Sequence, residues 1–283
     1  MFIKCVIGGL LLFIGFVGHT NQLYVAVASN FYSTLQQISS EFTASTGLRV
    51  VITTHSTGTL YAQILHGAPY DIFLAADQKR PDELVKKGIG ESKFTYALGR
   101  IALGSIESFP EPTTEDSLKK SFRYLAIPNP ELAPYGHAAR QVLTTLNLWQ
   151  PLQKKIVMGE NVGHTFSLLA TGNVDLGFIS LAQALSRTNR TNTWFWKVPL
   201  ALHDPIRQDA VILNKGNMED AKRFAAFLKS PDVRSKIRQF GYDLPELPRL
   251  AVNITRTFYL ELDRPQLSGH VEVAKAIPST ESC

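Results

Sequence analysis

Four short segments of this chain place hydroxyl, amide or glycine residues where a strand-like run meets a helix-like run. They are Val27-Ala28-Ser29-Asn30, His55-Ser56-Thr57-Gly58, Ala133-Pro134-Tyr135-Gly136 and Glu160-Asn161-Val162-Gly163. A strand-to-helix turn of this kind directs unpaired backbone N–H groups and the positive end of a helix dipole at one point. Such donors can hold an anion without a charged side chain. If several of these turns converge on one cleft, the protein is an oxyanion receptor.

The elements that must position these turns alternate between strand and helix periodicity, which is typical of an α/β fold. In the first part of the chain the sequence predicts strands at 23–28, 48–53 and 71–75. It predicts a helix that begins near Phe31 and ends at Gly47, and further helices at 57–66 and 80–87. We expect these elements to form a compact parallel sheet with crossover helices.

The second part of the chain repeats the alternation. Residues 95–105 predict one long strand that leaves the first domain and enters a second. The later strands are expected at 122–127, 174–179, 193–199 and 209–213, and the later helices at 137–146, 164–171, 218–229 and 231–240. A chain that crosses between domains near residue 100 and returns near 205 has a two-strand hinge, and the cleft beside a hinge is a natural ligand site.

The predicted fold is therefore α/β and two-lobed, with a ligand cleft at a two-strand hinge. Each lobe is expected to be a mixed, mostly parallel sheet flanked by helices. The predicted boundaries are 22–100 plus 205–243 for lobe 1, 101–204 for lobe 2 and 244–283 for a C-terminal extension. The extension carries no chemistry that we can name.

The first 21 residues have the layout of a secretory signal peptide. One charged residue, Lys4, precedes an apolar run from Cys5 to Val17, and small and polar residues follow. The alternative is an uncleaved membrane anchor, but the run is shorter than the roughly 20 residues that span a bilayer. After cleavage only Cys283 would remain, which leaves no internal disulfide. We therefore expect a soluble protein of the periplasm.

Composition and motifs exclude several classes of protein. The 283 residues are 45% hydrophobic and 19% charged, as in globular proteins, and the net charge is +5. No run combines clustered basic residues with aromatic ones, so we expect no nucleic-acid partner. The sequence has no G-x-S-x-G, P-loop or H-E-x-x-H motif, so we expect neither an enzyme nor a resident metal site.

Several strings of residues resemble, in their order and spacing, the periplasmic molybdate-binding proteins of ABC transporters. The strings span 26–31, 56–64, 67–78, 94–100, 134–136 and 205–208, so that the resemblance covers roughly residues 22–243. It implies a type II periplasmic binding fold that closes over a dehydrated tetrahedral oxyanion. In that family, neutral hydroxyls and backbone N–H groups hold the anion.

Transferred by position, the resemblance assigns seven ligand-binding residues. They are Ser29 and Asn30 in the first turn, Ser56 and Thr57 in the second, Tyr135 and Val162 through backbone N–H groups, and Ser180. The family often has a tyrosine at the position of Ser180. The resemblance therefore implies that either Tyr135 supplies a phenol or the pocket is rearranged.

The alternatives for these residues are structural. Serine, threonine and asparagine are favoured at helix N-caps without any ligand, and Ser180 fits an ordinary serine at a strand end. The predicted function is capture of molybdate, and also tungstate, by a monomer that delivers it to a membrane permease. No cofactor is expected, and no metal beyond the molybdenum of the bound anion. The alternatives are a receptor for sulfate or a small organic anion, or an enzyme or regulatory effector domain on the same scaffold.

Overall fold

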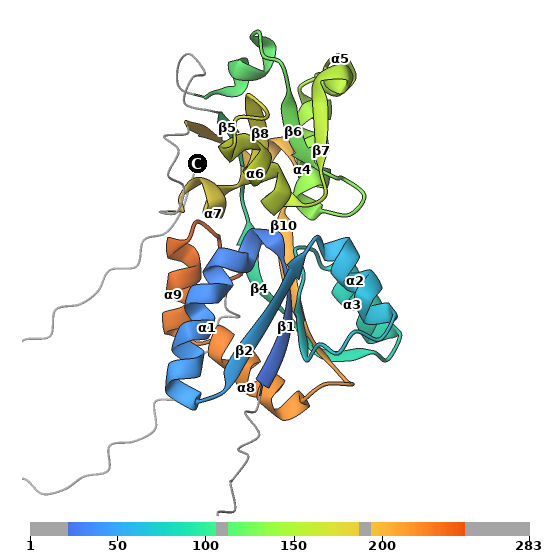
Figure 1. The fold of residues 1–283 in the computed structure, drawn as a ribbon, viewed down its shortest axis with the longest axis vertical. Coiled ribbons are helices and arrows are strands. Elements are labelled where there is room, and N and C mark those ends of the chain that lie inside the picture. The colour runs from blue at the N-terminus through green and yellow to red at the C-terminus, as the bar shows by residue number, and fades with distance from the viewer. Residues whose placement is uncertain (1–21, 106–112, 187–193, 247–283) are drawn as a thin grey trace, which may run out of the picture. The chain divides into compact units, whose positions relative to one another are not determined.

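The computed structural model describes residues 22–105, 113–186 and 194–246 (Figure 1). The predicted signal peptide lies outside these residues, as does all but the start of the predicted extension. The described residues up to Pro245 belong to one compact unit. They form two five-stranded sheets, each covered by helices. The predicted α/β class with two mixed sheets is confirmed.

The first sheet has the strand order β2-β1-β3-β10-β4. Its strands are β1 (Gln22–Ala28), β2 (Arg49–His55), β3 (Ile72–Leu74), β4 (Gly90–Gly99) and β10 (Ile206–Leu213). β1 is parallel to both its neighbours, and Val25 pairs with Ile52 on one side and Ile72 on the other. β10 is antiparallel to β3 and β4. This sheet is therefore not wholly parallel, because the late strand β10 inserts between β3 and β4.

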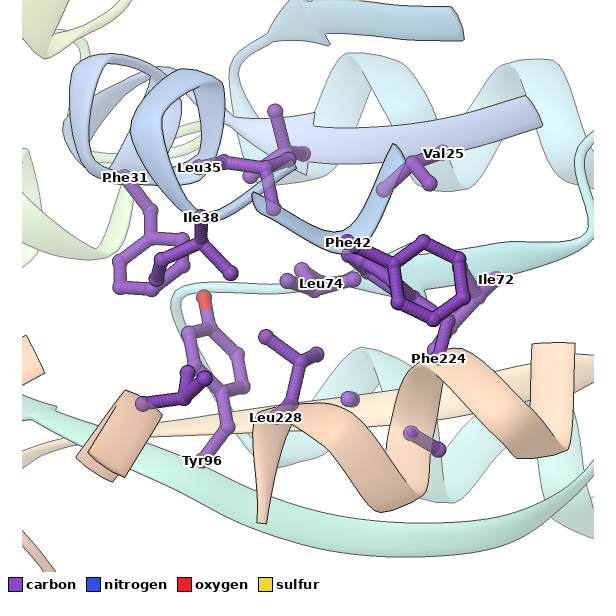
Figure 2. Close-up of a cluster of buried hydrophobic side chains, with 14 of the residues drawn as sticks. Val25, Phe31, Leu35, Ile38, Phe42, Ile72, Leu74, Tyr96, Phe224 and Leu228 are labelled. Carbon is purple, nitrogen blue, oxygen red and sulfur yellow. The ribbon is translucent and has the colours of Figure 1, made fainter. Parts of the chain in front are cut away.

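Helices cover both faces of the first sheet (Figure 1). One face carries α1 (Tyr32–Thr46), α8 (Met218–Leu228) and α9 (Pro231–Gln239), and the other carries α2 (Thr57–Leu65) and α3 (Lys79–Lys86). Alternation along β1 explains the two layers, because Val25 and Val27 join one buried cluster and Ala26 joins the other. Figure 2 shows the first cluster. In it the rings of Phe42 and Phe224 pack edge to face, with their centroids 4.9 Å apart.

The second sheet has the order β7-β6-β8-β5-β9. Its strands are β5 (Ile101–Ser105), β6 (Leu125–Pro128), β7 (Ile156–Gly159), β8 (Leu176–Ser180) and β9 (Phe195–Lys197). Two pairings are parallel and two are antiparallel, as in the first sheet. The helix α4 (Pro134–Thr145) packs into one buried cluster on this sheet, and α6 (Val162–Ala170) joins the same cluster through Val162 and a second cluster through Leu169. The shorter elements are η1 (Ser29–Phe31), η2 (Glu115–Lys119), α5 (Trp149–Leu152), η3 (Gln153–Lys155), α7 (Leu181–Ala184) and η4 (Leu200–Leu202).

Most predicted strands differ from the structure only by a few residues at their ends, but two predictions need a correction. The single strand expected at 95–105 is wrong, because β4 and β5 belong to different sheets and are separated by Arg100. The strand expected from residue 122 begins at Leu125. The backbone N–H groups of Arg123 and Tyr124 instead donate to the carboxylate of Asp175, at 2.5 and 3.4 Å, so they do not enter the ladder.

The chain passes from the first sheet to the second at Arg100 and returns between β9 and β10. We call the first sheet with its helices lobe 1 and the second sheet with its helices lobe 2. The exact boundaries predicted for the lobes stay a prediction. Within the described ranges, no helix has both the length and the apolar character needed to cross a bilayer.

Candidate functional site

The four turns found in the sequence each lead into a helical element. η1 begins at Ser29, α2 at Thr57, α4 at Pro134 and α6 at Val162. The first N–H groups of a helix have no acceptor within the helix itself. The backbone N–H groups at the starts of these elements are therefore donors that point out of the helix ends.

Three hydrogen bonds bring these helix starts together between the lobes. The N–H of Gly163 in α6 donates to Ser29 Oγ at 3.3 Å. The N–H of Gly58 in α2 donates to the carbonyl of Leu132, in the loop before α4, at 2.9 Å. The side-chain amide of Asn30 lies 3.4 Å from the Tyr135 hydroxyl. The starts of two helical elements of lobe 1 thus meet the starts of two helices of lobe 2.

The hydroxyls of Ser29 and Thr57 are arranged to donate. Ser29 Oγ accepts from Gly163, and Thr57 Oγ1 accepts the N–H of Ala76 at 3.1 Å. A hydroxyl that accepts from an N–H still has its own proton to give. Ser56 Oγ caps α2 by accepting the N–H of Thr59 at 3.2 Å, as expected of an N-cap serine.

Asn30 and Tyr135 belong to a buried polar network that spans both lobes. Asn30 Nδ2 donates to Oε1 of Gln208 at 2.8 Å, and Gln208 Nε2 donates to the Tyr135 hydroxyl at 3.4 Å. The hydroxyl of Tyr96 donates to the same Gln208 oxygen at 3.1 Å, and that of Tyr242 donates to the Asn30 carbonyl at 2.7 Å. Burial raises the pKa of Tyr135 well above its usual value, which keeps the phenol neutral.

Ser180 is completely buried at the end of β8, where it is the N-cap of α7. Its hydroxyl donates to Gln183 Oε1 at 2.9 Å and accepts the N–H of Gln183 at 3.2 Å. The hydroxyl proton of Ser180 is therefore already engaged. Gln183 Nε2 in turn donates to the carbonyl of Val162 at 3.3 Å, so the described contacts connect Ser180 to the other site residues through Gln183.

The structure thus joins most of the predicted residues around one interlobe junction. Direct contacts between the lobes involve Ser29, Asn30 and Tyr135. Ser56 and Thr57 lie next in sequence to Gly58, whose N–H donates to Leu132 of the other lobe. Among the described residues no group of three histidine, cysteine or acidic side chains could hold a metal ion.

Sequence reasoning gave no role to Gln183 or Gln208. The S-x-x-Q spacing from Ser180 to Gln183 is that of a capping box and could have indicated the first. Gln208 is a fully buried amide near the start of β10, between Arg207 and the equally buried Asp209. The strand was predicted only from residue 209, so Gln208 fell outside it, and its partners Asn30, Tyr96 and Tyr135 are far away in the sequence.

The sequence pattern described as bacterial extracellular solute-binding protein matches residues 23–243. The chain belongs to this family. Two similar solute-binding proteins are the molybdate-binding proteins ModA of Azotobacter vinelandii and Rhodobacter capsulatus. The first is 40% identical over 227 residues, which cover 79% of this chain and 90% of the relative. The second is 36% identical over 225 residues, which cover 78% and 88%.

A solved structure of the same kind agrees with the fold. The Azotobacter vinelandii periplasmic molybdate-binding protein superposes with a TM-score of 0.75 at 38% identity. The match covers 79% of this chain and 100% of that one. The relatives are thus solute-binding proteins rather than enzymes, and the predicted family and two-lobed binding fold are confirmed.

Proposed function

We propose that this solute-binding protein captures molybdate, with tungstate as a second ligand, and delivers it to the membrane permease of an ABC transporter. The observation that carries the proposal is the junction where helix starts of both lobes meet, with Ser29 Oγ against Gly163 N. The molybdate-binding relatives at 40% and 36% identity support the same ligand. We further propose that the protein works as a monomer after export to the periplasm.

The donor set suits a dianion that has lost its water. Hydroxyls of Ser29 and Thr57 and the first N–H groups of α2, α4 and α6 are neutral donors with fixed directions. Hydrogen bonds from such donors to a charged acceptor are worth about 1.5–3 kcal/mol each. Several of them replace the hydration of the anion without a salt bridge, and the helix dipoles add to the attraction.

Capture proceeds by closure of the lobes. Ser29, Asn30, Ser56 and Thr57 belong to lobe 1, whereas Tyr135, Val162 and Ser180 belong to lobe 2. An anion that accepts from both sets binds the closed form more tightly than the open form, so it shifts the population toward the closed form. Molybdate and sulfate offer the same acceptors, so selection between them rests on the size of the closed cavity.

Calorimetric titration of the purified protein with molybdate, tungstate, sulfate and phosphate tests the proposal. We expect molybdate and tungstate to bind more tightly than sulfate. Tight binding of sulfate with no response to molybdate would overturn the proposed ligand. No response to any oxyanion would overturn the proposed class of receptor.

A pair of serine variants tests the site itself. Ser29→Ala removes one donor to the anion, so we expect the Kd for molybdate to rise roughly ten- to a hundredfold. Ser40→Ala is the matched control, because its exposed hydroxyl donates only to the Gln36 carbonyl on α1. Equal affinities of the two variants would remove Ser29 from the site.

A further inference from the structure

Arg80 lies outside the predicted site, yet its side chain reaches from lobe 1 to lobe 2. It is the second residue of α3, and its Nη2 donates to the backbone carbonyl of Glu131 at 3.1 Å. Glu131 belongs to the loop that connects β6 to α4 in lobe 2. This hydrogen bond therefore crosses from one lobe to the other.

Asp77 fixes the direction of the Arg80 side chain. Oδ1 of Asp77 accepts the backbone N–H of Arg80 at 3.0 Å, and Oδ2 pairs with Nη1. A guanidinium is planar, so a carboxylate that holds one N–H group also sets the direction of the others. Because the carboxylate balances the charge of the guanidinium, the contact with Glu131 is a directional hydrogen bond more than a long-range attraction.

The crossing lies beside the start of α2, which carries Ser56 and Thr57. Gly58 donates to the carbonyl of Leu132, the residue after Glu131. A Cβ added to Gly58 would lie 3.1 Å from both Arg80 Nη2 and the Leu132 carbonyl oxygen. Arg80, Gly58, Glu131 and Leu132 thus form one contact zone between the lobes, which we call the clasp.

We propose that Arg80 is a positioning residue for ligand capture, which fastens the loop at 131–132 onto the start of α2 when the lobes close. The inference rests on the proposed function, since it deepens the account of how that site closes. The fastened loop leads into α4, so the clasp sets the position of Tyr135 relative to Thr57. Arg80 raises affinity by stabilising the closed form, without touching the anion.

The chain offers a matched pair of arginines for the test. The Arg80 side chain is 20% exposed and borders a cavity of about 510 Å³, so Arg80→Ala enlarges an existing space and leaves no sealed void. Arg140 borders the same cavity, and its Nη1 pairs with Glu131 Oε1 at 2.9 Å. That pair lies wholly within lobe 2. Arg140→Ala therefore removes a guanidinium from Glu131 without breaking a contact between lobes.

Hydrogen exchange, measured with saturating molybdate, reads the clasp directly in the closed form. The Gly58 amide is protected by its bond to Leu132, whereas the Leu60 amide donates to the Ser56 carbonyl within α2. In Arg80→Ala we expect exchange at Gly58 to accelerate roughly tenfold while exchange at Leu60 is unchanged. Calorimetry should give a roughly tenfold higher Kd for molybdate, and Arg140→Ala should match the wild type in both measurements.

A third variant separates a directional bond from simple charge. Arg80→Lys keeps the charge but lacks the fork that reaches Asp77 and Glu131 together, so we expect it to behave like Arg80→Ala. If Arg80→Lys behaves like the wild type, and if the loss of affinity in Arg80→Ala disappears at high salt, the role of Arg80 is charge steering and the clasp is overturned. Unchanged exchange at Gly58 in Arg80→Ala would also overturn it. Calorimetry on the wild type separates the two proposals: a wild type that binds no oxyanion overturns the proposed function, whereas a wild type that binds molybdate beside an Arg80→Ala protein with unchanged exchange at Gly58 overturns the clasp alone.

Discussion

The side-chain amide of Asn30 donates a hydrogen bond of 2.8 Å to Oε1 of Gln208, and both side chains are almost completely buried. Asn30 lies in η1 at the start of the chain's first helical segment, whereas Gln208 lies on β10, the strand that returns from lobe 2. Gln208 also donates to the hydroxyl of Tyr135 in lobe 2. One buried amide therefore orients a predicted site residue on each lobe.

Replacing Gln208 should cost stability and affinity together. Gln208→Met keeps the volume but removes the acceptor of Asn30 and the donor to Tyr135. A buried polar group left without its partner costs about 1–3 kcal/mol, so we expect a loss of that size in the free energy of unfolding, measured with urea. The Kd for molybdate should rise as well, because Asn30 and Tyr135 lose their orientation.

Gln36→Met is the control for that substitution. Gln36 Nε2 donates to the Tyr32 hydroxyl at 2.9 Å on the exposed side of α1. We expect this change to alter stability by less than about 0.5 kcal/mol. A Gln208→Met protein as stable as the control would mean that the buried network contributes nothing.

Gly58→Ala should separate the stability of the protein from closure. Alanine is favoured over glycine within a helix by up to about 1 kcal/mol, so the ligand-free protein should be at least as stable in urea. In the closed form the new methyl group would lie 3.1 Å from the Cα and carbonyl oxygen of Leu132. Overpacking of this kind costs about 1–3 kcal/mol, so the Kd for molybdate should rise roughly five- to a hundredfold.

A second glycine provides the comparison. A Cβ at Gly177 in β8 would meet its nearest neighbour, Leu169 Cβ, at 3.5 Å, an ordinary contact. Gly177→Ala should therefore leave the Kd unchanged. If Gly58→Ala binds molybdate as tightly as Gly177→Ala does, the contact with Leu132 is not part of the ligand-bound form.

Ser180→Ala should affect the molecule chiefly through the helix that Ser180 caps. Loss of an N-cap serine costs about 1 kcal/mol of stability. Because the hydroxyl proton is already donated to Gln183, we expect a smaller rise in Kd than the one caused by Ser29→Ala. Calorimetry on both variants decides the matter. An equal loss in Ser180→Ala would place its hydroxyl in contact with the ligand.

The sequence predicted the elements whose signals are local. The helix predicted from near Phe31 to Gly47 corresponds to α1, which runs from Tyr32 to Thr46, and its C-cap Gly47 has a φ of 73°, as its position after the last helical turn indicated. The break at Arg100 was missed because strand-like residues lie on both sides of it, and the single turn residue beside it, Gly99, is itself the last residue of β4. The placement of β10 between β3 and β4 depends on contacts between distant segments, for which no short-range pattern exists.

The residues of the candidate site also fall into those with a local signal in the sequence and those without one. The turns at Ser29, Ser56 and Val162 were visible because capping residues follow strand-like runs. The contact from Asn30 to Gln208 joins residues 178 positions apart, and the bond from Arg80 to the Glu131 carbonyl uses a backbone atom that every residue has. Neither leaves a pattern in a single sequence, so both needed the folded structure.

Buried tyrosines should make the protein sensitive to alkali. Burial raises the pKa values of Tyr96, Tyr135 and Tyr242 above the ordinary value of 10.0. In the unfolded chain these phenols release their protons near pH 10, whereas in the folded protein they hold them. The unfolded state therefore binds fewer protons above about pH 10, and the free energy of unfolding falls as the pH rises, by about 1.4 kcal/mol per pH unit for each such tyrosine. Below that pH these groups contribute no slope.

Urea unfolding above about pH 10 tests this dependence of stability on pH. The free energy of unfolding should fall less steeply with pH in Tyr135→Phe than in the wild type, by about 1.4 kcal/mol per pH unit. Tyr124→Phe is the control, because Tyr124 is 46% exposed, and it should keep the wild-type slope. If Tyr135→Phe also keeps the wild-type slope, the Tyr135 phenol ionises in the folded protein.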